Sequence, residues 1–205
     1  MNWKDKFFRI APVMLAVVTS GCTMSQVSLD YQPTLAQVVK GRPVLAVGRF
    51  TNSRGESAKY LGVVRTPIGT PLEYIYTRTS VEDIVRNAFT HACNARGMLT
   101  STSSAQYIIT GEVLEVSCSQ LVHPYGYARI RMNVVRAATG EMVFTRVYAG
   151  ERQNAAYRPG SGSPVPALRE LASRALQDAV DRALDDPEFR GRIRGGAPHY
   201  QPGML

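Results

Sequence analysis

The sequence predicts an α+β domain, in which two amphipathic helices pack on one face of a mixed, mostly antiparallel sheet. The expected order is β-α-β-β-β-α with an inserted hairpin. Three observations predict it. Residues 126–136 alternate apolar and polar side chains, as a half-buried strand does. Residues 79–97 and, near the C-terminus, residues 164–185 carry apolar side chains at helical spacing.

The first strand and the first helix rest on local signals. Residues 42–52 (RPVLAVGRFTN) indicate a strand that ends in the polar turn NSRGES. Ser80 followed by Asp83 makes a capping-box start for the helix over residues 79–97, and Gly97 is typical of a helix end. The apolar face of this helix comprises Val81, Ile84, Val85, Ala88, Phe89 and Ala92.

Residues 53–79, between that strand and that helix, are too many for a bare loop in a compact domain. KYLGVVRT and PLEYIYTRT flank TPIGTP, so we interpret the segment as an inserted hairpin. Tyr74 and Tyr76 project to one side of its second strand. Because exposed apolar side chains mark interfaces, both tyrosines are candidate partner-binding residues. The alternative is that the hairpin extends the sheet or covers its open face.

Three strands are expected over residues 106–118, 126–136 and 141–150, and the turn AATGE joins the last two. In the middle strand, Ala128, Ile130, Met132 and Val134 form the apolar face, and Tyr127, Arg129, Arg131 and Asn133 form the polar face.

We place Arg146, with Tyr148, beside that polar face. Arg129, Arg131 and Arg146 are therefore candidate residues for binding an anionic glycan, a lipid head group or a protein. The alternative is a solvated sheet face whose arginines pair across strands with Glu112 and Glu151.

The last helix has the clearest pattern in the chain, and Asp185-Asp186-Pro187 closes it. Arg174 lies on its polar face. Residues 192–205 are rich in Gly and Pro and are expected to be a disordered tail. The apolar stripe comprises Leu168, Leu171, Ala172, Ala175, Leu176, Ala179, Val180, Ala183 and Leu184.

The N-terminus has the layout of a secretory signal. Lys4, Lys6 and Arg9 precede a short apolar run that is too short to span a membrane. Small residues follow, and then Cys22. Thr19 to Cys22 (TSGC) resembles a bacterial lipobox, although the common form has Leu at its first position. The resemblance implies lipid attachment at Cys22, and Thr23 in the next position implies sorting to the outer membrane.

These signals divide the chain into a signal peptide (1–21), a lipidated tether (22–41), a single domain (42–191) and the tail (192–205). The 184 residues that remain without the signal are enough for one domain with a real core. The net charge of the whole chain is +8. Residues 1–21 carry three basic and one acidic side chain, so about +6 remains. For an exported protein, this charge favours anionic envelope partners rather than nucleic acid.

Two further cysteines, Cys93 and Cys118, would by default form a disulfide in an oxidising periplasm. We expect them to stay apart. Cys93 is placed near the end of a helix and Cys118 at the far end of the strand that follows. Residues 107–118 alone span about 36 Å, whereas a disulfide needs Cα atoms within about 7 Å.

RPVLAVGRFTNSRG looks like the first strand and turn of the TolB-N-terminal-like fold. VRNAFTHACNARGM, AQYIITGEVLEV, GYARIRMNVVRAATGEMVFTRVYAG and ALQDAVDRALDDPEFRGRI together resemble the YajG-type lipoprotein family. The resemblance covers residues 40–193 and rests on hydrophobic pattern and turns. It implies an outer-membrane lipoprotein whose domain faces the periplasm.

The sequence offers no constellation for catalysis, a metal or a cofactor. His91 and Cys93 lie on diverging helix faces, and Glu112 and Glu115 face opposite sides of one strand. The GSGS segment lacks the strand-turn-helix setting of a nucleophile elbow. We therefore expect no enzyme, but a membrane-tethered binding or scaffold module with a protein partner. The alternative function is a subunit of an oligomeric secretion or assembly complex, and an envelope enzyme is disfavoured.

Overall fold

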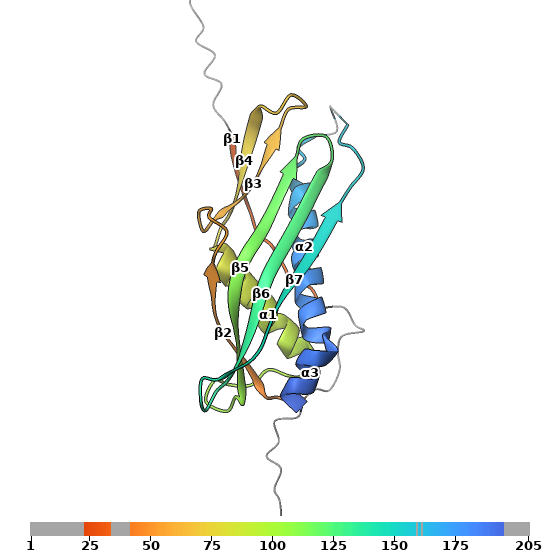
Figure 1. Cartoon of the computed structure of the whole chain (residues 1–205). Helices are drawn as coiled ribbons and strands as arrows, with labels where there is room; N and C mark the ends of the chain where they lie inside the picture. The colour runs from red at the N-terminus through yellow and green to blue at the C-terminus, as the bar shows by residue number, and fades with distance from the viewer. Residues whose placement is uncertain (1–22, 34–41, 159, 161, 195–205) are drawn as a thin grey trace, which may run out of the picture.

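The computed structural model describes residues 23–33, 42–158, 160 and 162–194 and confirms the α+β class (Figure 1). Its elements are β1 (Thr23–Val27), β2 (Leu45–Asn52), β3 (Tyr60–Arg65), β4 (Pro71–Thr77), α1 (Val81–Ala95), β5 (Tyr107–Gln120), β6 (Pro124–Arg136), β7 (Met142–Gln153), α2 (Val165–Asp185) and α3 (Pro187–Arg194).

All seven strands belong to one mixed sheet. Its order is β1-β4-β3-β5-β6-β7, and β2 pairs with β5 beyond the end of β3. Thus β3 and β2 share one edge of β5, with Val64 opposite Gln120 and Leu45 opposite Tyr107. The β5-β6-β7 meander is antiparallel, whereas β2 and β3 run parallel to β5.

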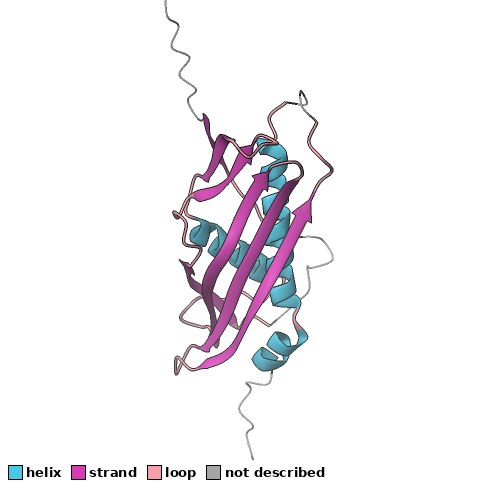
Figure 2. Cartoon of the chain, turned by 45° about the horizontal axis from the view of Figure 1, so that its top comes forward, coloured by secondary structure: helices cyan, strands magenta, loops and turns pink. Residues whose placement is uncertain are grey.

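Helices α1 and α2 lie on one face of this sheet and leave the other face open (Figure 2). Ser80 caps α1 as predicted, because its side chain accepts a hydrogen bond from the Asp83 backbone. The predicted apolar stripes of both helices are buried, and they face buried residues of β6 such as Ile130 and Met132. Helix periodicity and strand alternation therefore identified the core correctly.

Two glycines let α2 lie directly on the sheet. A Cβ at Gly126 of β6 would stand 2.4 Å from the backbone nitrogen of Ala172. A Cβ at Gly150 of β7 would stand 2.1 Å from the carbonyl oxygen of Ala175. Such distances are far below van der Waals contact, so only glycine permits this approach of backbone to backbone.

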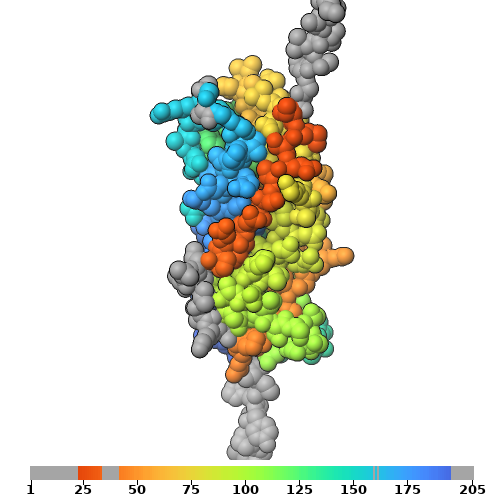
Figure 3. All heavy atoms as spheres, turned by 180° about the vertical axis from the view of Figure 1, so that it is seen from behind, coloured from red at the N-terminus to blue at the C-terminus, as the bar shows by residue number. Residues whose placement is uncertain are grey.

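The structure revises the expected tether. Residues 23–33 pack on the domain: β1 runs parallel to β4, and Val27 and Leu29 are buried in the core. Seen from behind, these residues run across the helix side between α2 and α1 (Figure 3). The packed part of the chain therefore includes residues that the sequence placed in a tether of residues 22–41. Cys22 and residues 34–41 lie outside the described residues.

The end of the chain also differs from expectation. Residues 187–194 form α3, which was not predicted, and its Phe189 is fully buried against Phe144 of β7. Asp186 begins this helix by accepting hydrogen bonds from the backbone N–H groups of Glu188 and Phe189. The domain thus extends to Arg194, and the rest of the predicted tail, residues 195–205, lies outside the described residues.

The inserted hairpin is confirmed as β3 and β4, joined by a turn over residues 66–70. It extends the sheet, since β3 pairs with β5 and β4 pairs with β1. Leu61, Val64 and Ile75 of the hairpin belong to the buried core. The alternative interpretation of residues 53–79, an extension of the sheet, is therefore correct.

Candidate interaction surface

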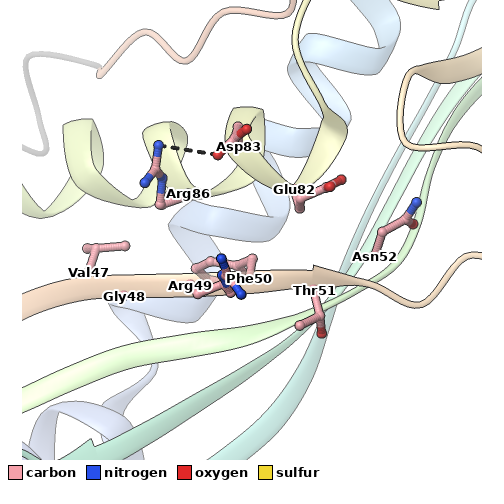
Figure 4. Close-up of a pocket in the computed structure, with 9 residues that line it drawn as sticks. All are labelled: Val47, Gly48, Arg49, Phe50, Thr51, Asn52, Glu82, Asp83 and Arg86. Carbon is pink, nitrogen blue, oxygen red and sulfur yellow. Dashed lines mark ion pairs between the residues drawn. The ribbon is translucent and has the colours of Figure 1, made fainter.

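A groove of about 580 Å³ lies between β2 and the first half of α1 (Figure 4). The side chain of Phe50 anchors β2 beneath the helix, because its ring stacks on Phe89 of α1 with centroids 5.0 Å apart. The residues that line the groove are Val47, Gly48, Arg49, Phe50, Thr51 and Asn52 of β2, and Glu82, Asp83 and Arg86 of α1.

The lining is charged on both walls. Arg49 of β2 is exposed. Arg86 pairs with Asp83 on α1 at 3.2 Å, and both side chains are about half exposed. Glu82 extends from the first turn of α1 toward Asn52 (Figure 4), and its buried Oε2 atom has no hydrogen-bond partner. A groove with paired and unpaired charges suits polar groups rather than an apolar ligand.

The wall made by β2 is a strand edge. β2 pairs with β5 along one side. Along the other side, Leu45 bridges to Leu99 at the start of the strand, and within the described residues no strand pairs with β2 beyond it. An edge strand presents N–H and C=O groups that can pair with another extended chain. The pairing with β5 also shifts register between Val47 and Phe50, a bulge of the kind found at sheet edges.

Arg54, which follows β2, holds the end of the groove in place. Its guanidinium donates hydrogen bonds to the carbonyl oxygens of Tyr60 and Val116, at 2.8 and 2.9 Å. Burial lowers the pKa of Arg54, and the negative charge of Glu82 partly offsets that effect. Arg54 therefore acts on the fold, and its charge also supports that of Glu82.

Among the predicted site residues, Tyr74 and Tyr76 are half-buried in β4, between β1 and β3. Tyr76 makes an edge contact with Tyr60 of β3, with ring centroids 5.8 Å apart. Ile75 between them is fully buried. The two tyrosines thus lie on the face opposite Ile75 and are part of the sheet surface.

Arg129 and Arg131 lie on the open face of β6, as the alternation predicted. Arg129 is exposed. Arg131 donates a hydrogen bond to Glu112 of β5 at 2.7 Å, which is the cross-strand pair that the alternative interpretation of this face expected. Both side chains of that pair are partly exposed, so it adds little to stability.

The placement of Arg146 beside these arginines is wrong. Arg146 stands opposite Met132 in the β6–β7 register, and residues opposite each other point to the same face, so Arg146 lies on the helix side. There it pairs with Asp186 at 2.6 Å and with Glu188. Tyr148 is buried on the same side, and its hydroxyl donates to Asp186 at 2.6 Å.

The tertiary structure also creates a buried arginine cluster that the sequence did not indicate. Arg96, at the C-terminal end of α1, is 2 % exposed and pairs with Asp181 and Asp185 of α2 at 3.0 and 3.1 Å. It also donates to the hydroxyl of Tyr31, which in turn donates to Asp181. Burial alone would lower the pKa of Arg96, but hydrogen bonds to Asp185, Tyr31 and Asp181 outweigh it and raise that pKa. The cluster joins the N-terminal arm, α1 and α2.

Cys93 and Cys118 are free and buried, in agreement with the expectation that they stay apart. Burial raises the pKa of each thiol to about 12, so neither provides a reactive thiolate at neutral pH. In the part of the chain that the structure describes, no group of three or more His, Cys, Asp or Glu side chains could hold a metal ion. No helix within the described ranges is long and apolar enough to cross a membrane.

Comparison with solved structures shows what this fold resembles. XCC0632 of Xanthomonas campestris, described with the family model DUF330, aligns with a TM-score of 0.60 and 14 % identity, over 84 % of this chain and 98 % of that one. This likeness shows the fold alone.

Two other structures match less well. A putative lipoprotein from Caulobacter crescentus has a TM-score of 0.36 and 13 % identity, over 48 % of this chain and 74 % of that one. The PelC dodecamer from Paraburkholderia phytofirmans has a TM-score of 0.38 and 12 % identity, over 75 % of this chain and 94 % of that one. Such TM-scores carry no argument about function. Neither protein-family models nor curated proteins gave a match.

Proposed function

We propose that this chain is a non-catalytic, YajG-type lipoprotein of the bacterial envelope that holds a protein-binding domain at the outer membrane. The TSGC segment supports lipid attachment at Cys22, and Thr23 supports outer-membrane sorting with the domain facing the periplasm. One acyl chain anchors a protein only marginally, whereas the several chains of a lipoprotein anchor it durably.

The observation that carries the binding function is the groove between the edge of β2 and α1. A sheet edge beside a helix is the arrangement in which a partner adds an extended strand. The backbone of β2 would supply the hydrogen bonds of the new ladder, and the charged groups of Arg49, Glu82 and Arg86 would select the side chains of the partner segment. The lining contains no histidine, cysteine or serine, so the groove suits recognition rather than nucleophilic catalysis.

The anchor is tested by Cys22→Ser in the producing bacterium. We expect the substituted protein to lose radiolabelled palmitate and to leave the membrane fraction, because no described helix can cross a membrane. Palmitate incorporation into the Cys22→Ser protein, or unchanged membrane fractionation, would show that the anchor lies elsewhere.

The groove is tested by placing a photoreactive phenylalanine analogue at Arg49 in intact cells. We expect ultraviolet light to produce a discrete adduct at Arg49 and none at Arg129 on the open sheet face. Arg86→Glu should weaken the adduct because it reverses the charge of one wall. Arg174→Glu is the matched control, since Arg174 also pairs on a helix surface, with Glu170, but far from the groove.

Each outcome of the crosslinking experiment has a defined meaning. An adduct with a second protein supports the binding module. An adduct with twice the mass of the chain would instead favour the alternative, a subunit of an oligomeric assembly. An adduct at Arg129 with none at Arg49 would reject the groove and support the open sheet face.

A further inference from the structure

Exposed apolar side chains gather at one end of the domain. Large apolar side chains that are exposed to solvent are uncommon in contiguous groups unless the group contacts a membrane or a partner. In the described part of the chain, six of the eight such side chains belong to this end. Ile68 is 90 % exposed and Met24 is 70 % exposed. The six are Met24, Ile68, Leu72, Leu121, Val122 and Tyr125.

The sheet topology brings these residues together from distant parts of the sequence. Thr23, the first residue of β1, stands opposite Glu73 near the start of β4, beside the turn of residues 66–70. Val64 of β3 stands opposite Gln120 of β5, so this turn and the β5–β6 loop leave the sheet at the same end. Figure 3 shows the start of β1 and the β3–β4 hairpin side by side there.

The proposed lipid site adjoins this end of the domain. The hydroxyl of Thr23 donates to the carbonyl oxygen of Leu72 at 3.4 Å. Cys22 directly precedes Thr23, and consecutive Cα atoms are about 3.8 Å apart. Because Thr23 is already part of the sheet, no free linker separates the domain from a lipid on Cys22.

We propose that this end of the domain lies against the membrane surface, with Met24, Ile68 and Leu72 inserted among the lipid head groups. The inference rests on the proposed lipid anchor at Cys22. Acyl chains on Cys22 must enter the bilayer, and the one-residue step to Thr23 then holds Leu72 and Met24 at the interface. The turn that carries Ile68 adjoins them, so its apolar tip leaves water at the same time.

This contact fixes the orientation of the domain. The long strands β5, β6 and β7 lead away from the membrane, and α3 occupies the far end (Figure 1). β2 and its groove lie toward that far end, where a periplasmic partner can reach them (Figure 1). The membrane contact and the partner groove are therefore separate surfaces.

The test is a fluorescent probe on the lipidated protein in vesicles of phosphatidylethanolamine and phosphatidylglycerol. Ile68→Cys places an environment-sensitive nitrobenzoxadiazole group at the apolar tip. Thr139→Cys is the control, because Thr139 is exposed in the β6–β7 turn at the opposite end. Cys93 and Cys118 are buried and will not react with the dye, and a lipid blocks the thiol of Cys22.

We expect the Ile68 probe to shift its emission to the blue and to gain about two-fold in intensity on vesicles, as a dye does on leaving water. Quencher groups on the lipids should then quench it, whereas the Thr139 probe should behave as in water. If the unlabelled protein floats with vesicles but the two probes respond alike, this end does not face the membrane and is left for a protein partner. If the unlabelled protein and its Cys22→Ser variant fail to float equally, the lipid anchor itself is wrong, and this inference falls with it.

Discussion

Gly150→Ala tests whether α2 lies directly on the sheet. The added Cβ would stand 2.1 Å from the carbonyl oxygen of Ala175 and 3.0 Å from its carbonyl carbon and from the Cβ of Asp178. Non-bonded heavy atoms prefer about 3.5–4.0 Å, so the helix must move away by roughly 1 Å or more. The listed neighbours are backbone and Cβ atoms, which cannot rotate aside.

The movement disturbs more than one contact. α2 packs on both β6 and β7, and Ala175 and Leu176 are buried within that layer. Overpacking of a rigid core commonly costs about 1–3 kcal/mol, and here we expect the upper part of that range or beyond. At a slope of about 1–3 kcal/mol per molar urea, the unfolding midpoint should fall by about 1 M or more.

Gly191→Ala is the matched control. Gly191 lies in α3 with no heavy atom within 4 Å of an added Cβ. There the substitution should stabilise the protein by about 0.5–1 kcal/mol, because alanine favours a helix over glycine. Urea unfolding followed by circular dichroism measures both variants. A Gly150→Ala midpoint equal to or above that of the Gly191→Ala protein would refute direct packing of α2 on β7.

Two further predictions concern buried residues of the helix layer. Leu176→Ala should lower the free energy of unfolding by about 2–5 kcal/mol through lost burial and a cavity, whereas Arg174→Ala on the exposed face should change it by less than about 0.5 kcal/mol; equal denaturation midpoints would mean that the wrong face of α2 is buried. Arg96→Ala should lower the free energy of unfolding by about 3 kcal/mol, because it leaves the carboxylates of the cluster without their buried partner. Arg152→Ala, which removes a half-exposed pair with Asp178, should lower it by less than about 1 kcal/mol, and a similar loss in both variants would argue against a special role for the buried cluster.

Several elements were determined by local sequence alone. The start of α1 follows from Ser80 and Asp83, and the buried faces of α1 and α2 follow from apolar spacing. The alternation in β6 correctly separated Ile130 and Met132 from Arg129 and Arg131. Such signals can be read from the sequence because a helix or a half-buried strand repeats its exposure every few residues.

The partners of the strands could not be read in this way. Residues 23–27 show no sustained period, and they become β1 only because β4, nearly fifty residues later, offers its edge. The two faces of β7 both mix polar and apolar residues, so alternation alone could not place Arg146, and the register with β6 decides its position. Arg96 is buried because Asp181, Asp185 and Tyr31 neutralise and bond it, and all three lie far away in the sequence.

The same distinction applies to the two proposed surfaces. The sequence alone indicated the lipid attachment at Cys22 and the strand that contains Arg49. It could not show that one edge of β2 lacks a partner, because that depends on β3 ending before it covers β5. Nor could it bring Met24, Ile68 and Val122 to one end of the domain. Periodicity reports whether a side chain is buried, whereas the order and register of strands report which residues meet, and only the folded chain fixes these.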